Sequence, residues 1–175
     1  KTIDLHCDTL MEAYINKADS LYSLPNTRID VESLLAGNYL GQFFAIFMPS
    51  EEIIKELSFK NYSDTDYFEA LIGIFNNTLE EHSDVIAFAG NYEDIQKNFQ
   101  QKKLAALLTL EDGRLIDSRL ENLDYYHKRG IRLITLTWNG FNCFGAPNSR
   151  DRKVMSMGLT PFGKEAIGYM NHLGI

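Results

Sequence analysis

Two side chains that can bind a metal, His6 and Asp8, lie near the start of the sequence and are separated by one residue. They close a short apolar run at positions 2–7 that is typical of a buried strand. Residues i and i+2 of a strand point to the same side, so both side chains face one volume while Cys7 points away. An imidazole beside a carboxylate suits zinc, or a histidine–aspartate pair. The alternative is a chance pair at a strand end, or Asp8 as the cap of a following helix.

A third candidate, Glu111, ends the apolar run at 104–110. The carboxyl end of a parallel strand is where open sheets and barrels both place their sites. Asp112 and Gly113 follow, so we expect the backbone to turn sharply there. The alternative is that Glu111 and Asp112 only begin a solvated loop and cap Arg114 or its neighbours. Together with the first pair, Glu111 suggests a hydrolytic zinc site, in which a carboxylate between two metals holds both and a bridging water becomes a nucleophile.

Other kinds of catalytic machinery find little support. The sequence has no G-x-S-x-G motif, no phosphate-binding P-loop and no dinucleotide fingerprint. Cys7 points off the candidate site, and Cys143 lies in a predicted loop without an identifiable partner base. Trp138, followed by Asn139, ends a strand-like run and could line a pocket, although core packing explains it equally well.

The elements that would position these residues alternate along the chain. Strands are predicted at 2–7, 40–48, 85–89, 104–110 and 131–138, with helices at 66–82, 91–103, 118–130 and 160–173. The helix at 66–82 has one apolar face, and Ser63 or Asp64 could cap its start. Asn91 is the expected cap of the next helix. Two further helix starts have specific signals: a capping box from Ser118 to Glu121, and Thr160 as N-cap before Pro161. This alternation predicts parallel βαβ units, with a doubly wound sheet and a (β/α)8 barrel both compatible. A barrel typically takes roughly 250 residues, more than this chain has.

Bulk composition excludes several classes of protein. The 175 residues suffice for a single domain at 1–175, and 24 acidic against 17 basic residues give a net charge of −7. That balance argues against nucleic-acid or anionic-membrane partners, and no apolar stretch reaches membrane-spanning length. Two cysteines are few for a secreted scaffold, so we expect reduced thiols, a cytoplasmic location and a small-molecule substrate.

Four blocks of sequence resemble the membrane (renal) dipeptidase family of zinc metallopeptidases. They are TIDLHCDT at 2–9, LTLEDG at 108–113, LITLTWN at 133–139 and GLTPFGKE at 158–165. The blocks occur in the family's order and the resemblance covers nearly the whole chain. The last block is the most specific of the four, and the His-x-Asp pair is the least specific.

The resemblance implies a (β/α)8 barrel with two zinc ions at its carboxyl face. His6 and Asp8 would bind the first zinc, Glu111 would bridge both ions, and the bridging hydroxide would attack the scissile carbonyl group of a dipeptide. Family members often accept a D-residue at the carboxyl end of the substrate and are usually homodimers. The family's two later histidine ligands, its carboxylate-gripping arginine and an acidic proton-transfer residue would follow Ile175. The chain is therefore expected to cover roughly the first half of the barrel.

One position departs from many relatives. They carry a histidine, thought to hold the reacting carbonyl group, where this chain has Trp138. An indole can only donate a hydrogen bond, which puts substrate preference in question. Trp138 and Asn139 are nevertheless predicted to contact the substrate.

Two other functions stay open. The first is another barrel amidohydrolase acting on a cyclic amide or ester. Such enzymes usually begin with His-x-His, so Asp8 argues against this function. The second is a zinc- or peptide-binding homologue without turnover, which Trp138 favours slightly.

Overall fold

The computed structural model describes residues 1–59 and 62–175, which form two compact units. The first unit contains Lys1–Ile46 and Glu51–Leu108, and the second contains Phe47–Ser50 and Thr109–Ile175. Strand β4 (Leu104–Glu111) contributes residues to both. The expectation of a single domain stays a prediction. Among the described residues, no helix is both long and apolar enough to cross a membrane.

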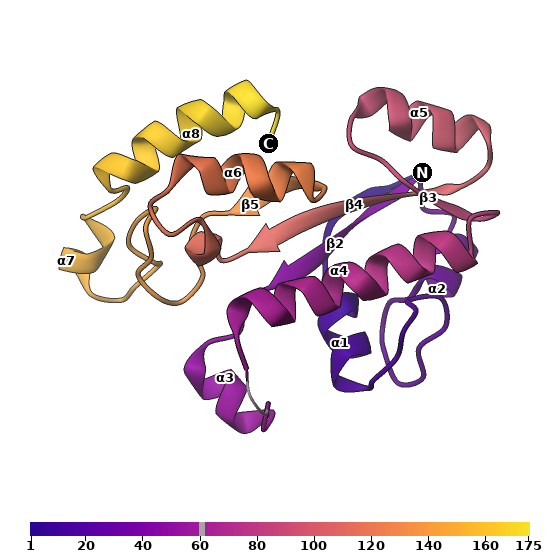
Figure 1. Cartoon of the computed structure of the whole chain (residues 1–175), viewed down its shortest axis with the longest axis horizontal. Helices are drawn as coiled ribbons and strands as arrows, with labels where there is room; N and C mark the ends of the chain where they lie inside the picture. The colour runs from indigo at the N-terminus through magenta and orange to yellow at the C-terminus, as the bar shows by residue number, and fades with distance from the viewer. Residues whose placement is uncertain (60–61) are drawn as a thin grey trace. The chain divides into compact units, whose positions relative to one another are not determined.

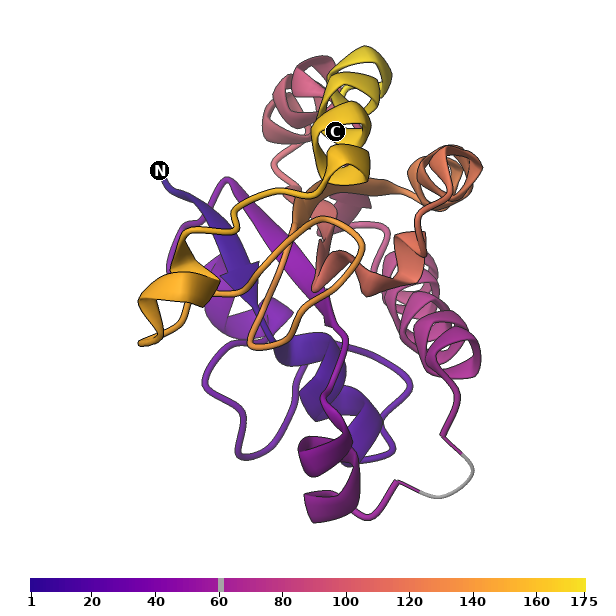
Figure 2. The same cartoon turned by 90° about the vertical axis from the view of Figure 1, so that its left-hand side faces the viewer.

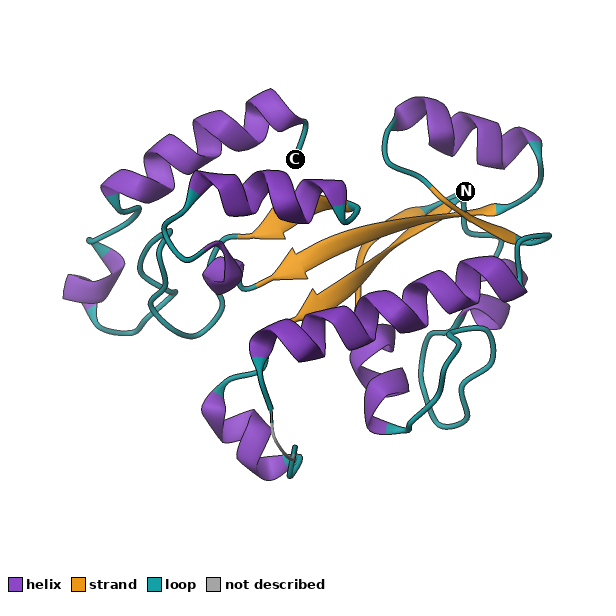
Figure 3. Ribbon diagram, in the orientation of Figure 1, coloured by secondary structure: helices purple, strands orange, loops and turns teal. Residues whose placement is uncertain are grey.

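The strands form a parallel α/β sheet, as the sequence predicts. Strands β1 (Ile3–Cys7), β2 (Gly41–Phe47), β4 and β3 (Ile86–Phe88) are hydrogen-bonded in that order, with β1–β2 and β3–β4 parallel. At one end of β2, the Leu40 carbonyl accepts from the Ala105 N–H at 3.0 Å. At the other end, the Met48 N–H donates to the Glu111 carbonyl at 3.0 Å. Strands β2 and β4 therefore also run in the same direction (Figure 3).

The helices of the first unit are α1 (Thr9–Ile15), α2 (Val31–Ala36), α3 (Glu51–Glu56), α4 (Asp64–Glu81) and α5 (Tyr92–Gln100). Helix α4 packs against α1 and β3 (Figure 1). It buries the predicted apolar face and begins at Ser63, whose hydroxyl accepts from the Asp66 N–H at 3.1 Å. Asn91 caps α5 in the same way, as predicted. The sequence pattern did not indicate α1, α2 and α3, because six or seven residues are too few to show a helical period.

The second unit contains the end of β4, β5 (Ile131–Thr135), a 3₁₀ turn η1 (Gly113–Ile116), and α6 (Leu120–Lys128), α7 (Arg152–Met155) and α8 (Pro161–Leu173). Strand β5 pairs with β4, and α6 packs against β5 and α8. The long loop between β5 and α7 can be followed in Figure 2. Helix α8 begins as predicted, because the Thr160 hydroxyl accepts from the Gly163 N–H at 2.9 Å. It ends at Gly174, whose φ is 79°.

The capping box predicted at Ser118 is wrong. Asp117 and Ser118 have φ values of 49° and 55°, whereas an N-cap residue needs an extended backbone. Arg119 takes the N-cap position of α6 instead. The carboxylate of Glu121 accepts from the Arg119 Nε–H at 3.0 Å.

The fifth strand is shorter than predicted and ends at Thr135 instead of Trp138. Beyond that residue the Leu136 carbonyl accepts from the Gly113 N–H at 3.3 Å and from the Asn142 amide at 2.7 Å. The Gly113 N–H and the Asn142 side chain thus take the place of the hydrogen bonds that a neighbouring strand would make, and Trp138 lies in a loop.

Candidate metal site

His6 and Asp8 lie at the carboxyl end of β1, in the first unit. Alternation along the chain buries Cys7 to 6% exposure and also buries Thr9, while the side chains of His6 and Asp8 are 40% and 47% exposed. The His6 Nε2 atom is 3.3 Å from Asp8 Oδ1. The two side chains therefore share one exposed face, as the spacing predicts.

The alternative role of Asp8 as a helix cap is wrong. Asp8 occupies the N-cap position of α1, but among the described residues its carboxylate accepts no capping hydrogen bond from that helix. Its backbone, with φ −91° and ψ 17°, is not extended. The carboxylate is thus not used to satisfy the first turn of α1.

The spacing of the pair fits zinc. Two donor atoms about 2.0–2.1 Å from a tetrahedral ion lie about 3.3–3.4 Å from each other. His6 Nε2 and Asp8 Oδ1, which are in direct hydrogen-bond or ion-pair contact, are 3.3 Å apart and so match this value. Nitrogen and carboxylate oxygen are also ligand types that zinc accepts.

Cys7 takes no part in this chemistry. Burial raises the pKa of the Cys7 thiol to about 11, so the thiol stays protonated near neutral pH. Its Sγ lies 3.7 Å from the Phe43 carbonyl, to which the thiol donates. Burial likewise raises the pKa of Cys143 in the second unit. Neither cysteine is poised as a nucleophile.

A cavity of about 370 Å³ opens beside the pair, within the first unit. Its lining combines the end of β1, the first turn of α1 and the loop before α2: His6, Cys7, Asp8, Thr9, Glu12, Asn26, Thr27, Arg28 and Ile29. A molecule in this cavity would lie directly against the two candidate ligands.

Glu111 ends β4, in the second unit, and is half-buried. The next residue, Asp112, has a φ of 70°, so the predicted sharp turn is present. Asp112 is only 6% exposed, and its Oδ1 accepts from the Arg114 N–H at 3.1 Å and the Asn142 amide at 2.6 Å. Asp112 is therefore buried rather than solvated, but its carboxylate caps the 3₁₀ turn at Arg114, as that alternative also predicts.

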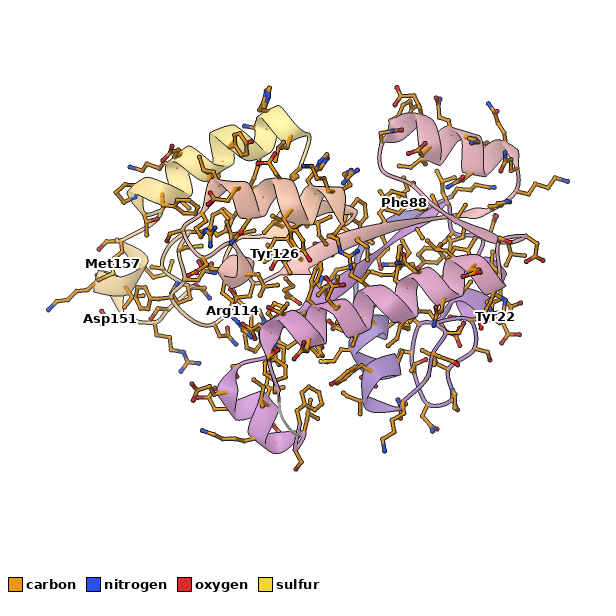
Figure 4. The ribbon with its side chains drawn as sticks, viewed as in Figure 1. Tyr22, Phe88, Arg114, Tyr126, Asp151 and Met157 are labelled. Carbon is orange, nitrogen blue, oxygen red and sulfur yellow. The ribbon has the colours of Figure 1, made fainter. Side chains whose placement is uncertain are left out.

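The Arg114 side chain fixes the backbone that follows β2. Its Nη1 donates to the Met48 carbonyl at 2.8 Å and its Nη2 donates to the Pro49 carbonyl at 2.9 Å. Figure 4 marks Arg114 beside the short 3₁₀ turn. Because Met48 also donates to the Glu111 carbonyl, Arg114 helps to hold the end of β4.

Sequence reasoning missed Asp112, Arg114 and Asn142 as residues that position the strand end. The Asp-Gly pair directly after the buried strand predicted the turn, but not these hydrogen bonds. Gly113 is required there, because a Cβ would lie 2.5 Å from the ring of Phe144.

Trp138 is half-buried in the loop after β5 and packs edge-to-face on Phe47, with ring centroids 4.9 Å apart at 74°. Asn139 beside it is exposed. Trp138 thus has a packing partner. The predicted contact of Trp138 and Asn139 with substrate stays a prediction.

These features define a parallel α/β protein with candidate metal ligands at the carboxyl ends of its strands. The family model of the membrane dipeptidases, peptidase family M19, matches residues 1–175. The chain belongs to this family, as the four sequence blocks indicate.

Individual relatives agree. The chain is 29% identical over 123 residues to the dipeptidase ataJ of Aspergillus terreus, a match covering 67% of this chain and 29% of that protein. Its fold matches a metallopeptidase called dipeptidase AC with a TM-score of 0.78 at 17% identity, covering 98% of this chain and 55% of that one. A metallopeptidase of Rhodobacter sphaeroides, liganded with a phosphinate mimic of L-Ala-D-Ala, matches with a TM-score of 0.73 at 17% identity, covering 98% and 56%.

The chain therefore spans between 29% and 56% of the length of these three proteins. At 17% identity the two structural matches establish the fold alone.

Proposed function

We propose that the protein is a metallo-dipeptidase that hydrolyses dipeptides with two zinc ions, and that His6, Asp8 and Glu111 are among their ligands. The observation that carries the proposal is the 3.3 Å separation of His6 Nε2 and Asp8 Oδ1 at the end of β1. It occurs in a chain whose 175 residues all match the dipeptidase family.

The role of Glu111 as the bridging ligand is supported by donor type and by strand order. Histidine nitrogen and the carboxylate oxygens of aspartate and glutamate are all ligand types that zinc accepts. Strand β2 lies between β1 and β4, and these strands run in the same direction, so their carboxyl ends belong to one edge of the sheet. A carboxylate has two oxygens and can bind one ion with each.

Bound zinc would supply a nucleophilic water near neutral pH and positive charge to stabilise the oxyanion. The residues of this chain would then hold and orient the site. His6 and Asp8 keep their shared face through the burial of Cys7 and Thr9, and the hydrogen bonds around Asp112 hold the backbone next to Glu111. The mimic of L-Ala-D-Ala bound by the Rhodobacter relative supports a D-residue at the carboxyl end of the substrate.

The test is zinc-dependent hydrolysis by the protein as its gene encodes it, measured on L-Ala-L-Ala, L-Ala-D-Ala and a wider dipeptide panel. We expect turnover that a chelator abolishes and added zinc restores. Zinc bound without turnover on any dipeptide would favour a binding protein without catalysis, and turnover on a cyclic amide alone would favour another amidohydrolase.

Glu111→Gln tests the bridge within the same assay. The change keeps the size of the side chain but removes its charge, so we expect zinc per chain to fall from two toward one, with loss of turnover. Glu93→Gln on the exposed side of α5 is the matched control and should keep both ions. Two tightly held zinc ions in Glu111→Gln would refute the bridge. The homodimer and the cytoplasmic location stay predictions.

A further inference from the structure

We propose that the cavity beside His6 and Asp8 selects dipeptides that carry an acidic side chain, and that Arg28 is the residue that binds it. The inference rests on the proposed dipeptidase function and names a substrate class for it.

The cavity has the size and position of a substrate subsite. Its volume of about 370 Å³ lies in the range of small-molecule pockets, and both candidate metal ligands line it. A peptide whose scissile bond is held at the metals would therefore have a neighbouring side chain within reach of this cavity.

Arg28 is the cation of the cavity wall. Its side chain is exposed, and among the described residues it makes no hydrogen bond or ion pair. A guanidinium group presents a planar fork of N–H donors that matches a carboxylate in two parallel hydrogen bonds. An arginine without a partner, beside a substrate-sized cavity, is complementary to an aspartate or glutamate side chain.

The other charges around the cavity decide between acidic and basic substrates. His6 and Asp8 are assigned to the metal, so the charge of Asp8 is offset there. Glu12 is half-buried on α1, and within the described part of the chain it forms no ion pair with Arg28. Arg28 is therefore the exposed group of the cavity wall that can bind a carboxylate through two hydrogen bonds. Glu12 would reduce the affinity for an acidic side chain without abolishing it.

A hydrogen bond between Thr9 and Ile29 keeps Arg28 close to the candidate ligands. The Thr9 hydroxyl donates to the Ile29 carbonyl at 2.9 Å, which links the residue after Asp8 to the residue after Arg28. This bond therefore keeps the backbone at Arg28 close to the end of β1.

The rest of the loop before α2 is also fixed. Tyr22 stacks on His82 with centroids 4.0 Å apart and planes at 12°, and Figure 4 marks Tyr22 in this loop. The Leu21 N–H donates to the Thr78 hydroxyl at 2.9 Å, and the Leu24 N–H donates to the Asp30 carboxylate at 3.0 Å. An ordered wall loses little conformational entropy when a ligand binds, which favours selectivity.

The experiment compares kcat/KM for Ala-Asp with Ala-Asn and for Asp-Ala with Asn-Ala, because each pair differs only in charge. The acidic-to-neutral ratio should fall about tenfold or more in Arg28→Gln, the loss typical of a charge-assisted hydrogen bond. Arg28→Lys should restore part of the ratio, and Glu12→Gln should raise it. Lys97→Gln, which removes a charge from the exposed face of α5, should leave the ratio as it is.

The outcomes separate the two proposals. Hydrolysis of neutral dipeptides with a ratio that Arg28→Gln does not change overturns the acidic subsite and leaves the dipeptidase function standing. A preference for Ala-Lys that Glu12→Gln removes also overturns it, since the cavity would then bind cations. No hydrolysis of any dipeptide by the zinc-loaded protein would overturn both.

Discussion

Replacing Gly163 by alanine should be among the most damaging single changes in α8. A Cβ at this position would lie well under 3.0 Å from the Phe144 carbonyl oxygen and 3.0 Å from its carbonyl carbon. These atoms are backbone and are held from both sides. The Phe144 carbonyl accepts from the Thr160 N–H at 2.9 Å, and the Phe144 N–H donates to Asn142 Oδ1 at 2.9 Å.

The magnitude follows from two opposing terms. Forcing an extra methyl group into a packed contact costs about 1–3 kcal/mol, and the upper end applies because backbone atoms must move. Alanine also favours the helix over glycine by about 1 kcal/mol. We therefore expect Gly163→Ala to lower the free energy of unfolding by about 2 kcal/mol.

Gly168 on the same helix is the matched control. It is exposed, and none of the described atoms lies within 4 Å of an added Cβ, so Gly168→Ala should raise the free energy of unfolding by about 0.5–1 kcal/mol. Urea titrations followed by circular dichroism would measure both variants. Equal midpoints for the two would refute the argument that α8 approaches Phe144 through Gly163.

Three further predictions test other parts of the molecule. Asp8→Asn should lower zinc content while leaving the melting temperature of the zinc-free protein nearly unchanged, because the carboxylate does not cap α1; a lowered melting temperature with full zinc content would contradict the ligand role. Trp138→His should raise turnover on simple dipeptides, and unchanged turnover would make Trp138 a packing residue on Phe47. Burial alone would raise the pKa of Asp30, but hydrogen bonds from the Leu24 and Ser33 N–H groups outweigh it and hold the pKa below its ordinary value of 3.8. The stabilisation by the ionised Asp30 carboxylate is therefore present above pH 3.8 and is lost as the pH falls through the lower pKa of the folded state. Asp30→Ala should destabilise the protein by about 1 kcal/mol at pH 7 and by less in strong acid. Denaturant titrations at both pH values would measure this difference.

The elements that the sequence could predict are those with a local cause. The apolar face of α4, the caps at Ser63, Asn91 and Thr160, and the shared face of His6 and Asp8 each depend on residues within one or two turns of each other. The spacing of apolar residues and the capping chemistry of helix ends determine such features, and a single amino-acid sequence shows both.

The elements that were missed depend on distant partners. The strand predicted at 131–138 ends early because the Leu136 carbonyl accepts hydrogen bonds from the Gly113 N–H and the Asn142 amide. No local sequence pattern predicts these two hydrogen bonds. The buried environment of Asp112 has the same origin, since its amide partner Asn142 is 30 residues away. The wall that carries Arg28 is likewise built by bonds to Thr9 and Thr78, which lie outside the loop.

The bonds of Arg114 to Met48 and Pro49 have a consequence for the rate at which the native state opens. They join residues 66 and 65 positions apart, so a long stretch of chain must be organised before they can form. We predict that these contacts form after the rate-limiting step of folding, which φ-values of Arg114 variants near zero would confirm. Weakening them would therefore speed unfolding much more than it slows folding. Arg114 would therefore slow the unfolding of the end of β4 and lengthen the lifetime of the folded site, with little effect on the folding rate.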